Sequence, residues 1–77
     1  MTQARLVPYR RLKKVVEAAG FRWVRRDGSH NIFQNSDGRV LVNPDHGARE
    51  IGRGLLGKIL RQAGLSVDDY HGLLDDL

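Results

Sequence analysis

Three histidines, His30, His46 and His71, are the side chains of this sequence that could move a proton near neutral pH. His30 comes shortly after the turn dipeptide Asp27-Gly28 and begins a predicted strand, so a rigid sheet would hold its ring clear of the backbone. His46 follows a proline in a loop that contains glycine, where helix capping, phosphate binding and catalysis all stay open. His71 lies in an acidic C-terminal segment, and we expect it to be a surface residue only.

Basic side chains accompany His30 on the neighbouring predicted strand, at Arg22, Arg25 and Arg26. This grouping suits attack on a phosphodiester, because arginine can stabilise the negative charge that builds up on the phosphorane oxygens. A neutral imidazole could take the proton from a ribose 2′-OH as that oxygen attacks its own 3′-phosphate, a route that requires RNA. A lone histidine at the start of a strand is also compatible with a purely structural role, so the pattern alone leaves both roles open.

Several other chemistries are excluded or disfavoured by the sequence. The histidines have no short chelating spacing and no helical i, i+4 pair, which argues against a metal site. The absence of cysteine excludes disulfides, thiol catalysis and cysteine-type zinc sites. There is no glycine-rich phosphate loop of the P-loop kind and no serine nucleophile elbow. We therefore expect a protein that works without a metal ion or cofactor.

Apolar spacing and turn residues predict the elements that must position these side chains. A helix from Pro8 to Gly20 has one apolar stripe, and three β-rich runs follow at residues 21–26, 29–34 and 39–43. Because tight turns separate these short runs, they predict an antiparallel meander.

The remaining third of the chain is predicted to be helical after a loop at residues 44–54. A second amphipathic helix covers residues 56–63 and is closed by Gly64. A short third helix follows Ser66, which is placed to form a capping box with Asp69.

The length of 77 residues predicts a single domain, residues 1–77, with a small core. The order α-β-β-β-α with a short terminal helix predicts an α+β fold, in which helices cover one face of a three-stranded sheet. Trp23 and Phe33, the largest apolar side chains, are expected in the core against the helices. The sequence contains no apolar stretch long enough for a membrane span and no signal-peptide core near its start, so we expect a cytoplasmic protein without a membrane partner.

Charge is divided unevenly along the chain. Thirteen basic residues against nine acidic ones give a net charge of +4, and all thirteen lie between Arg5 and Arg61. The last four acids follow them, at Asp68, Asp69, Asp75 and Asp76. A basic body of this kind suits a polyanionic partner, but an ordinary soluble surface can carry the same charge, so charge alone does not select a function.

Three blocks of the sequence carry a family resemblance. Residues 19–33, AGFRWVRRDGSHNIF, contain a helix end at glycine plus an aromatic, a strand, and then Gly-Ser-His followed by a hydrophobic pair. Residues 43–47 contain a Pro-x-His pattern, and residues 54–65 read GLLGKILRQAGL. In this order and spacing, over residues 8–70, the chain resembles the HicA toxin family of type II toxin–antitoxin systems.

The resemblance implies a double-stranded-RNA-binding-domain-like fold and a small ribonuclease that cuts mRNA without a metal. It implies that the histidine of Gly-Ser-His is the catalytic residue, a role that carries over to His30 alone. Ser29 and His46 stay open as auxiliary residues. It also implies a protein partner, a HicB-type antitoxin that covers and blocks the active site.

Two positions depart from the family pattern. Leu55 replaces the usual threonine at the start of the second helix, so Gly54 is left as an alternative cap. Asn43 replaces the usual valine before the loop proline, which we expect to weaken the end of the third strand.

Three functions fit these observations. In the first, a ribonuclease toxin uses His30 as general acid or base, and basic side chains hold RNA phosphates: Arg22, Arg25, Arg26, Lys58 and Arg61. In the second, a non-catalytic module binds RNA with the same basic surface, since a fold alone does not determine function. In the third, the domain is an interaction module whose only ligand is the antitoxin. Of these, the resemblance favours the ribonuclease.

Overall fold

The described residues form three helices and a three-stranded antiparallel sheet. The structure is a computed structural model that describes residues 3–44 and 48–77. The sheet has the order β1-β2-β3, and both neighbouring pairs are antiparallel, so the predicted meander and α+β class are confirmed. The elements are α1 (Tyr9–Ala18), β1 (Arg22–Asp27), β2 (His30–Gln34), β3 (Val40–Pro44), α2 (Arg53–Ala63) and α3 (Val67–Asp75).

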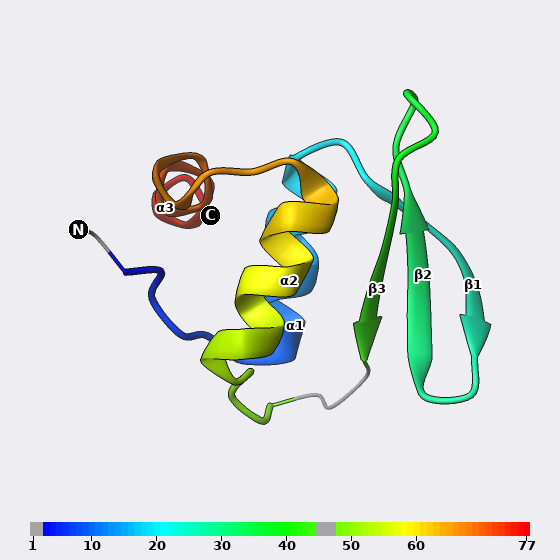
Figure 1. The fold of residues 1–77 in the computed structure, drawn as a ribbon, viewed down its shortest axis with the longest axis horizontal. Helices are drawn as coiled ribbons and strands as arrows, with labels where there is room; N and C mark the ends of the chain where they lie inside the picture. The colour runs from blue at the N-terminus through cyan, green and yellow to red at the C-terminus, as the bar shows by residue number, and fades with distance from the viewer. Residues whose placement is uncertain (1–2, 45–47) are drawn as a thin grey trace.

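All three helices lie on one side of the sheet, as predicted (Figure 1). α1 and α2 both pack against β3, whereas β2 and then β1 lie progressively further from them (Figure 1). α3 packs on α1 on the side away from the sheet. The helices therefore cover β3 and part of β2, and β1 lies beyond their reach.

The core lies between α1, α2, α3 and the two nearer strands. Each of these elements contributes at least one fully buried apolar side chain, and burying one of them stabilises the fold by about 1.5–3 kcal/mol. Phe33 of β2 belongs to this set, as predicted. The side chains with no exposed surface include Leu12, Val15, Val16, Phe33, Leu41, Leu56, Ile59 and Tyr70.

Trp23 does not lie in the core, and this prediction is wrong. Its side chain is 52% exposed, and all six residues of β1 are exposed. The physical reason is its position in the sheet: β1 pairs only with β2 and is the strand furthest from the helices. Phe33 is directly opposite Trp23 in the register, yet only Phe33 is covered.

Local signals end and begin the helices largely as the sequence predicts. Gly64 caps α2 in the left-handed conformation with a φ of 72°. Ser66 and Asp69 form the predicted capping box at the start of α3. The start of α2 differs, because its N-cap is Gly52 and the helix begins two residues before Leu55. The threonine position is thus already inside the helix, and the expected cap at Gly54 is wrong.

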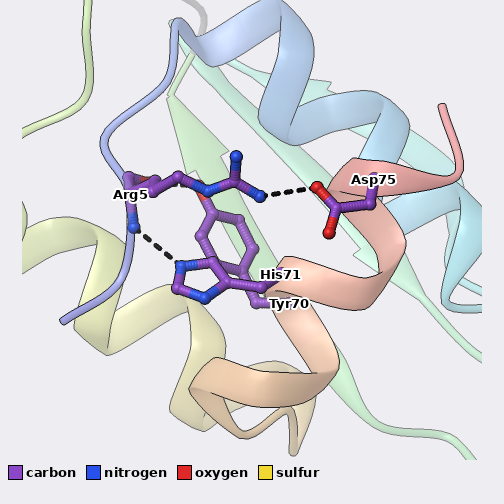
Figure 2. Close-up of polar contacts among 4 residues, drawn as sticks. All are labelled: Arg5, Tyr70, His71 and Asp75. Carbon is purple, nitrogen blue, oxygen red and sulfur yellow. Dashed lines mark hydrogen bonds and ion pairs between the residues drawn. The ribbon is translucent and has the colours of Figure 1, made fainter. Parts of the chain in front are cut away.

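The N-terminal segment is held against α3 by three polar contacts around Arg5 (Figure 2). The Tyr70 hydroxyl donates to the Arg5 carbonyl at 2.6 Å. The Arg5 backbone N–H donates to Nε2 of His71 at 3.1 Å, and the Arg5 guanidinium pairs with Asp75 at 2.8 Å. The expectation that His71 is only a surface residue is therefore wrong, since its ring links the two ends of the described chain.

Candidate active site

His30 is positioned by the tight turn of the β1–β2 hairpin. Asp27 and His30 are the last paired residues of the two strands, and Gly28-Ser29 forms the two-residue loop between them. Gly28 has a φ of 62°, whereas no described non-glycine residue has a positive φ. Glycine with positive φ at the first loop position is the pattern of a type II′ turn, whose twist matches that of the strands. The turn thus fixes the backbone of His30 at the start of β2.

His30 lines a pocket between the sheet and α2. The pocket has a volume of about 330 Å³ and is lined by His30, Val42, Pro44, Leu55, Lys58 and Gln62. Pro44 is directly opposite His30 in the register of β2 and β3. The Val42 N–H donates to Oε1 of Gln62 at 3.2 Å, and this bond ties α2 to the free edge of β3. The pocket therefore lies at the edge of the sheet, where the Gln62 side chain of α2 pairs with β3.

Lys58 is the cation that shares this pocket with His30. It lies on the same face of α2 as Leu55 and Gln62, because their spacing of three and four residues returns to one side of a helix. An exposed ammonium beside an imidazole can hold phosphate oxygens while the imidazole takes or gives a proton. The structure thus brings together two of the predicted site residues that are 28 positions apart in the sequence.

The three arginines of β1 do not share one face. Arg22 is opposite Gln34 and Arg25 is opposite Ile32, so both lie on the face of β2 that carries His30. Arg26 is opposite Asn31 and lies on the other face, where its Nε donates to the Gly28 carbonyl at 2.9 Å. Because the register shifts between Trp23 and Arg25, Arg22 lies on the same face as Arg25, although the two are an odd number of positions apart.

The other predicted residues lie in different surroundings. Ser29 is exposed in the hairpin loop beside His30 and does not line the pocket. Arg61 is exposed on α2, on a face that does not line the pocket. His46 lies outside the described residues. Within residues 3–44 and 48–77, no group of three His, Cys, Asp or Glu residues is placed to hold a metal ion.

Sequence reasoning missed Gln62 and the apolar wall of the pocket. Leu55, Lys58 and Gln62 could have been grouped from their helical spacing alone. Their position next to His30 could not have been predicted from spacing, because it depends on how α2 packs against β3. Val42 and Pro44 alternate with the buried Leu41 and Asn43, which places them on the opposite face of the strand.

Asn43 is a buried polar residue inside β3. Its side chain is only 3% exposed, and no donor among the described residues reaches its Oδ1. The strand continues to Pro44, so the expected weakening does not shorten it. A buried acceptor without a partner costs about 1–3 kcal/mol.

Comparison with known proteins identifies the class of this chain. The family model described as HicA toxin of bacterial toxin-antitoxin matches residues 9–65, which include both His30 and Lys58. The chain therefore belongs to the HicA toxin family, and the predicted resemblance is confirmed. It is also similar to the protein named "Probable mRNA interferase HicA" of Pseudomonas fluorescens (strain Pf0-1), with 40% identity over 58 residues. That alignment covers 74% of this chain and 93% of the relative.

Among the described helices, none is long and apolar enough to cross a membrane.

Proposed function

We propose that this protein is an endoribonuclease toxin that cleaves mRNA without a metal ion, with His30 as its general acid–base residue. The observation that carries the proposal is the shared pocket of His30 and Lys58. The name of the relative from P. fluorescens, an mRNA interferase, supports the same substrate class.

In the proposed reaction, His30 takes the proton of a ribose 2′-OH as that oxygen attacks the adjacent phosphorus. The bond between phosphorus and the 5′ oxygen breaks, and the leaving oxygen takes a proton from water. The hydroxide that remains removes the proton from His30 and returns the imidazole to its neutral form. Lys58 stabilises the charge on the phosphorane oxygens. Arg22 and Arg25, on the face of His30, hold neighbouring phosphates, and Ser29 and His46 are auxiliary candidates. The products are a 2′,3′-cyclic phosphate and a 5′-hydroxyl end.

The family also suggests a partner and a setting for this activity. We infer that residues 1–77 act as one domain of double-stranded-RNA-binding-domain-like fold in the cytoplasm. We infer further that a HicB-type antitoxin inhibits the toxin by covering the His30 pocket. A partner that presents carboxylates to Lys58 and Arg25 would complement the charge there. Addition of the purified antitoxin should stop cleavage and protect this face from hydrogen exchange.

The test of the catalytic proposal compares the wild type with His30→Ala on a long single-stranded RNA in EDTA. His71→Gln is the matched control, because glutamine keeps an acceptor toward Arg5 and this histidine lies away from the pocket. Circular dichroism and filter binding report folding and RNA affinity. Cleavage by the wild type and His71→Gln alone, with cyclic phosphate ends, is the expected result. Equal cleavage by all three proteins would show that His30 is not the catalytic residue. Binding without cleavage by any of them would favour the RNA-binding module.

A further inference from the structure

Trp23 is the largest exposed apolar side chain among the described residues, and it lies outside the apolar core. It is 52% exposed on β1, the strand that no helix covers. Exposing this much of an indole to water costs free energy that burial would recover. Single exposed apolar side chains are common on protein surfaces, so the surroundings of Trp23 decide whether it belongs to a binding site.

The indole ring is held in place by a hydrogen bond across the hairpin. Its Nε1–H donates to Oδ1 of Asn31 at 3.0 Å, and Asn31 directly follows His30 in β2. Because the one polar group of the ring is already paired, a ligand meets mainly the flat π-face and the hydrocarbon edge. The strand that carries His30 thus also fixes the orientation of Trp23.

The charge around Trp23 selects an anionic ligand. Arg26 lies on the same face of β1 as Trp23, whereas Arg22 and Arg25 lie next to it along the strand on the face of His30. Asp27, at the end of β1, is the one acidic residue of the strand. Positive charge with an exposed aromatic ring is the combination by which proteins bind single-stranded nucleic acid, through phosphate contacts and base stacking. An acidic peptide would satisfy the arginines but would leave the flat ring without a matching partner.

We propose that Trp23 is a stacking platform for an unpaired base of single-stranded RNA. Trp23 and His30 lie on opposite faces of the hairpin, so the stacked base is not the one at the cleaved bond. The RNA crosses the free edge of β1, where Arg22 and Arg25 hold its phosphates, before it reaches His30. Trp23 therefore sets affinity rather than the chemical step. The inference deepens the proposed function, since it adds a base-binding subsite to the same RNA substrate.

The test uses Trp23 as its own probe, because it is the single tryptophan of the sequence. The His30→Ala protein is titrated with a single-stranded oligonucleotide of unmodified RNA, with the same oligonucleotide made abasic, and with inorganic polyphosphate. Stacking should quench the tryptophan fluorescence with the unmodified RNA. The abasic RNA and polyphosphate should bind at low salt without this quenching, because they offer phosphates and no bases. Equal quenching by all three ligands, or no quenching at RNA concentrations that saturate the protein, would overturn the proposal.

A second measurement separates this inference from the proposed function. In filter binding, Trp23→Ala should weaken RNA affinity by about 5- to 150-fold, and Trp23→Phe should lose less. Val40→Ala is the matched control, since Val40 is 48% exposed on the opposite edge strand, and it should leave affinity unchanged. In an active wild-type background, Trp23→Ala should raise KM and leave kcat unchanged.

If the wild type cleaves RNA but Trp23→Ala keeps full affinity, the stacking site is refuted and the ribonuclease stands. If RNA quenches the fluorescence but no cleavage occurs, the ribonuclease fails and the stacking site stands. If only an antitoxin protein changes the fluorescence, Trp23 belongs to a protein interface instead.

Discussion

The Tyr70 hydroxyl is the most informative single group for the stability of this domain. The ring is fully buried, and its O–H donates to the Arg5 carbonyl at 2.6 Å (Figure 2). Tyr70→Phe keeps the ring and removes the hydrogen bond, so the free energy of unfolding should fall by about 0.5–1.5 kcal/mol. For a domain of this size, a loss of 1 kcal/mol lowers Tm by roughly 4–8 °C. Tyr70→Ala should cost about 3–5 kcal/mol, because it also leaves a cavity.

Alkaline pH gives the same group a second signature. Burial raises the pKa of the Tyr70 hydroxyl above its ordinary value of 10.0, although the positive charges of Arg5 and Arg11 oppose this shift. The folded state therefore keeps its proton to higher pH than the unfolded state does. The stabilisation by the Tyr70 hydroxyl is complete below pH 10, the pKa of this group in the unfolded chain. It is lost as pH rises through the higher pKa of the folded state. The wild type should lose stability as pH rises through this range. Tyr70→Phe has no hydroxyl that could ionise, so the difference in free energy of unfolding between the two proteins should become smaller.

Urea unfolding followed by circular dichroism, from neutral to strongly alkaline pH, measures both effects. The comparison is made in the full chain and in a variant that lacks residues 1–5, which removes the acceptor carbonyl. In the shortened chain, Tyr70→Phe should cost little at neutral pH. An equal cost in both backgrounds would refute the assignment of the stabilisation to the bond with Arg5. A difference that stays constant through the alkaline window would refute the pKa argument.

Four further substitutions test other parts of the structure. Gly28→Ala should cost about 1–2 kcal/mol in urea unfolding, because Gly28 has a φ of 62°, and should also slow RNA cleavage by moving the start of β2. Lys58→Gln should reduce kcat about 100-fold, as loss of one charge-stabilising group does, whereas Arg61→Gln, outside the pocket, should leave kcat unchanged; equal kinetics for the two variants would contradict the pocket assignment. Ser66→Ala should lower stability in thermal unfolding by about 1 kcal/mol, since it removes the N-cap of α3. Asn43→Val should raise stability by about 1 kcal/mol in urea unfolding, because it removes a buried oxygen without a partner among the described residues, and a loss of stability would argue against this reasoning.

The sequence predicts the elements of this fold well because their signals are local. Gly64 ends α2 and Ser66 with Asp69 begins α3, each through residues a few positions apart. The hairpin turn is likewise marked by Gly28, although the loop proves to be Gly28-Ser29 with Asp27 as the last strand residue. Element order then follows from the chain, and a meander is the simplest pairing of three short strands with tight turns.

The predictions that failed depend on contacts between distant segments. Trp23 and Phe33 both lie inside predicted strands and are paired across the sheet, but only Phe33 lies where the helices cover it. Arg25 and Arg26 lie on opposite faces because adjacent strand residues alternate, but a register shift places Arg22 with Arg25 rather than with Arg26, and no turn residue signals that shift. His71 meets Arg5 across 66 positions, and nothing near either residue predicts that contact. The shared pocket of His30 and Lys58 could not be predicted for the same reason, because it depends on how α2 packs against β3.

The position of β1 separates stability from binding in this small domain. No side chain of β1 is buried, so the core that holds the fold is built without this strand. Replacing an exposed side chain away from caps, buried partners and strained turns changes stability by at most about 0.5 kcal/mol. Substitutions at Arg22, Trp23 and Arg25 should therefore leave unfolding nearly unchanged, and any loss of RNA affinity can be assigned to binding itself. The opposite outcome, in which these variants unfold easily, would mean that β1 stabilises the β2 strand on which His30 depends.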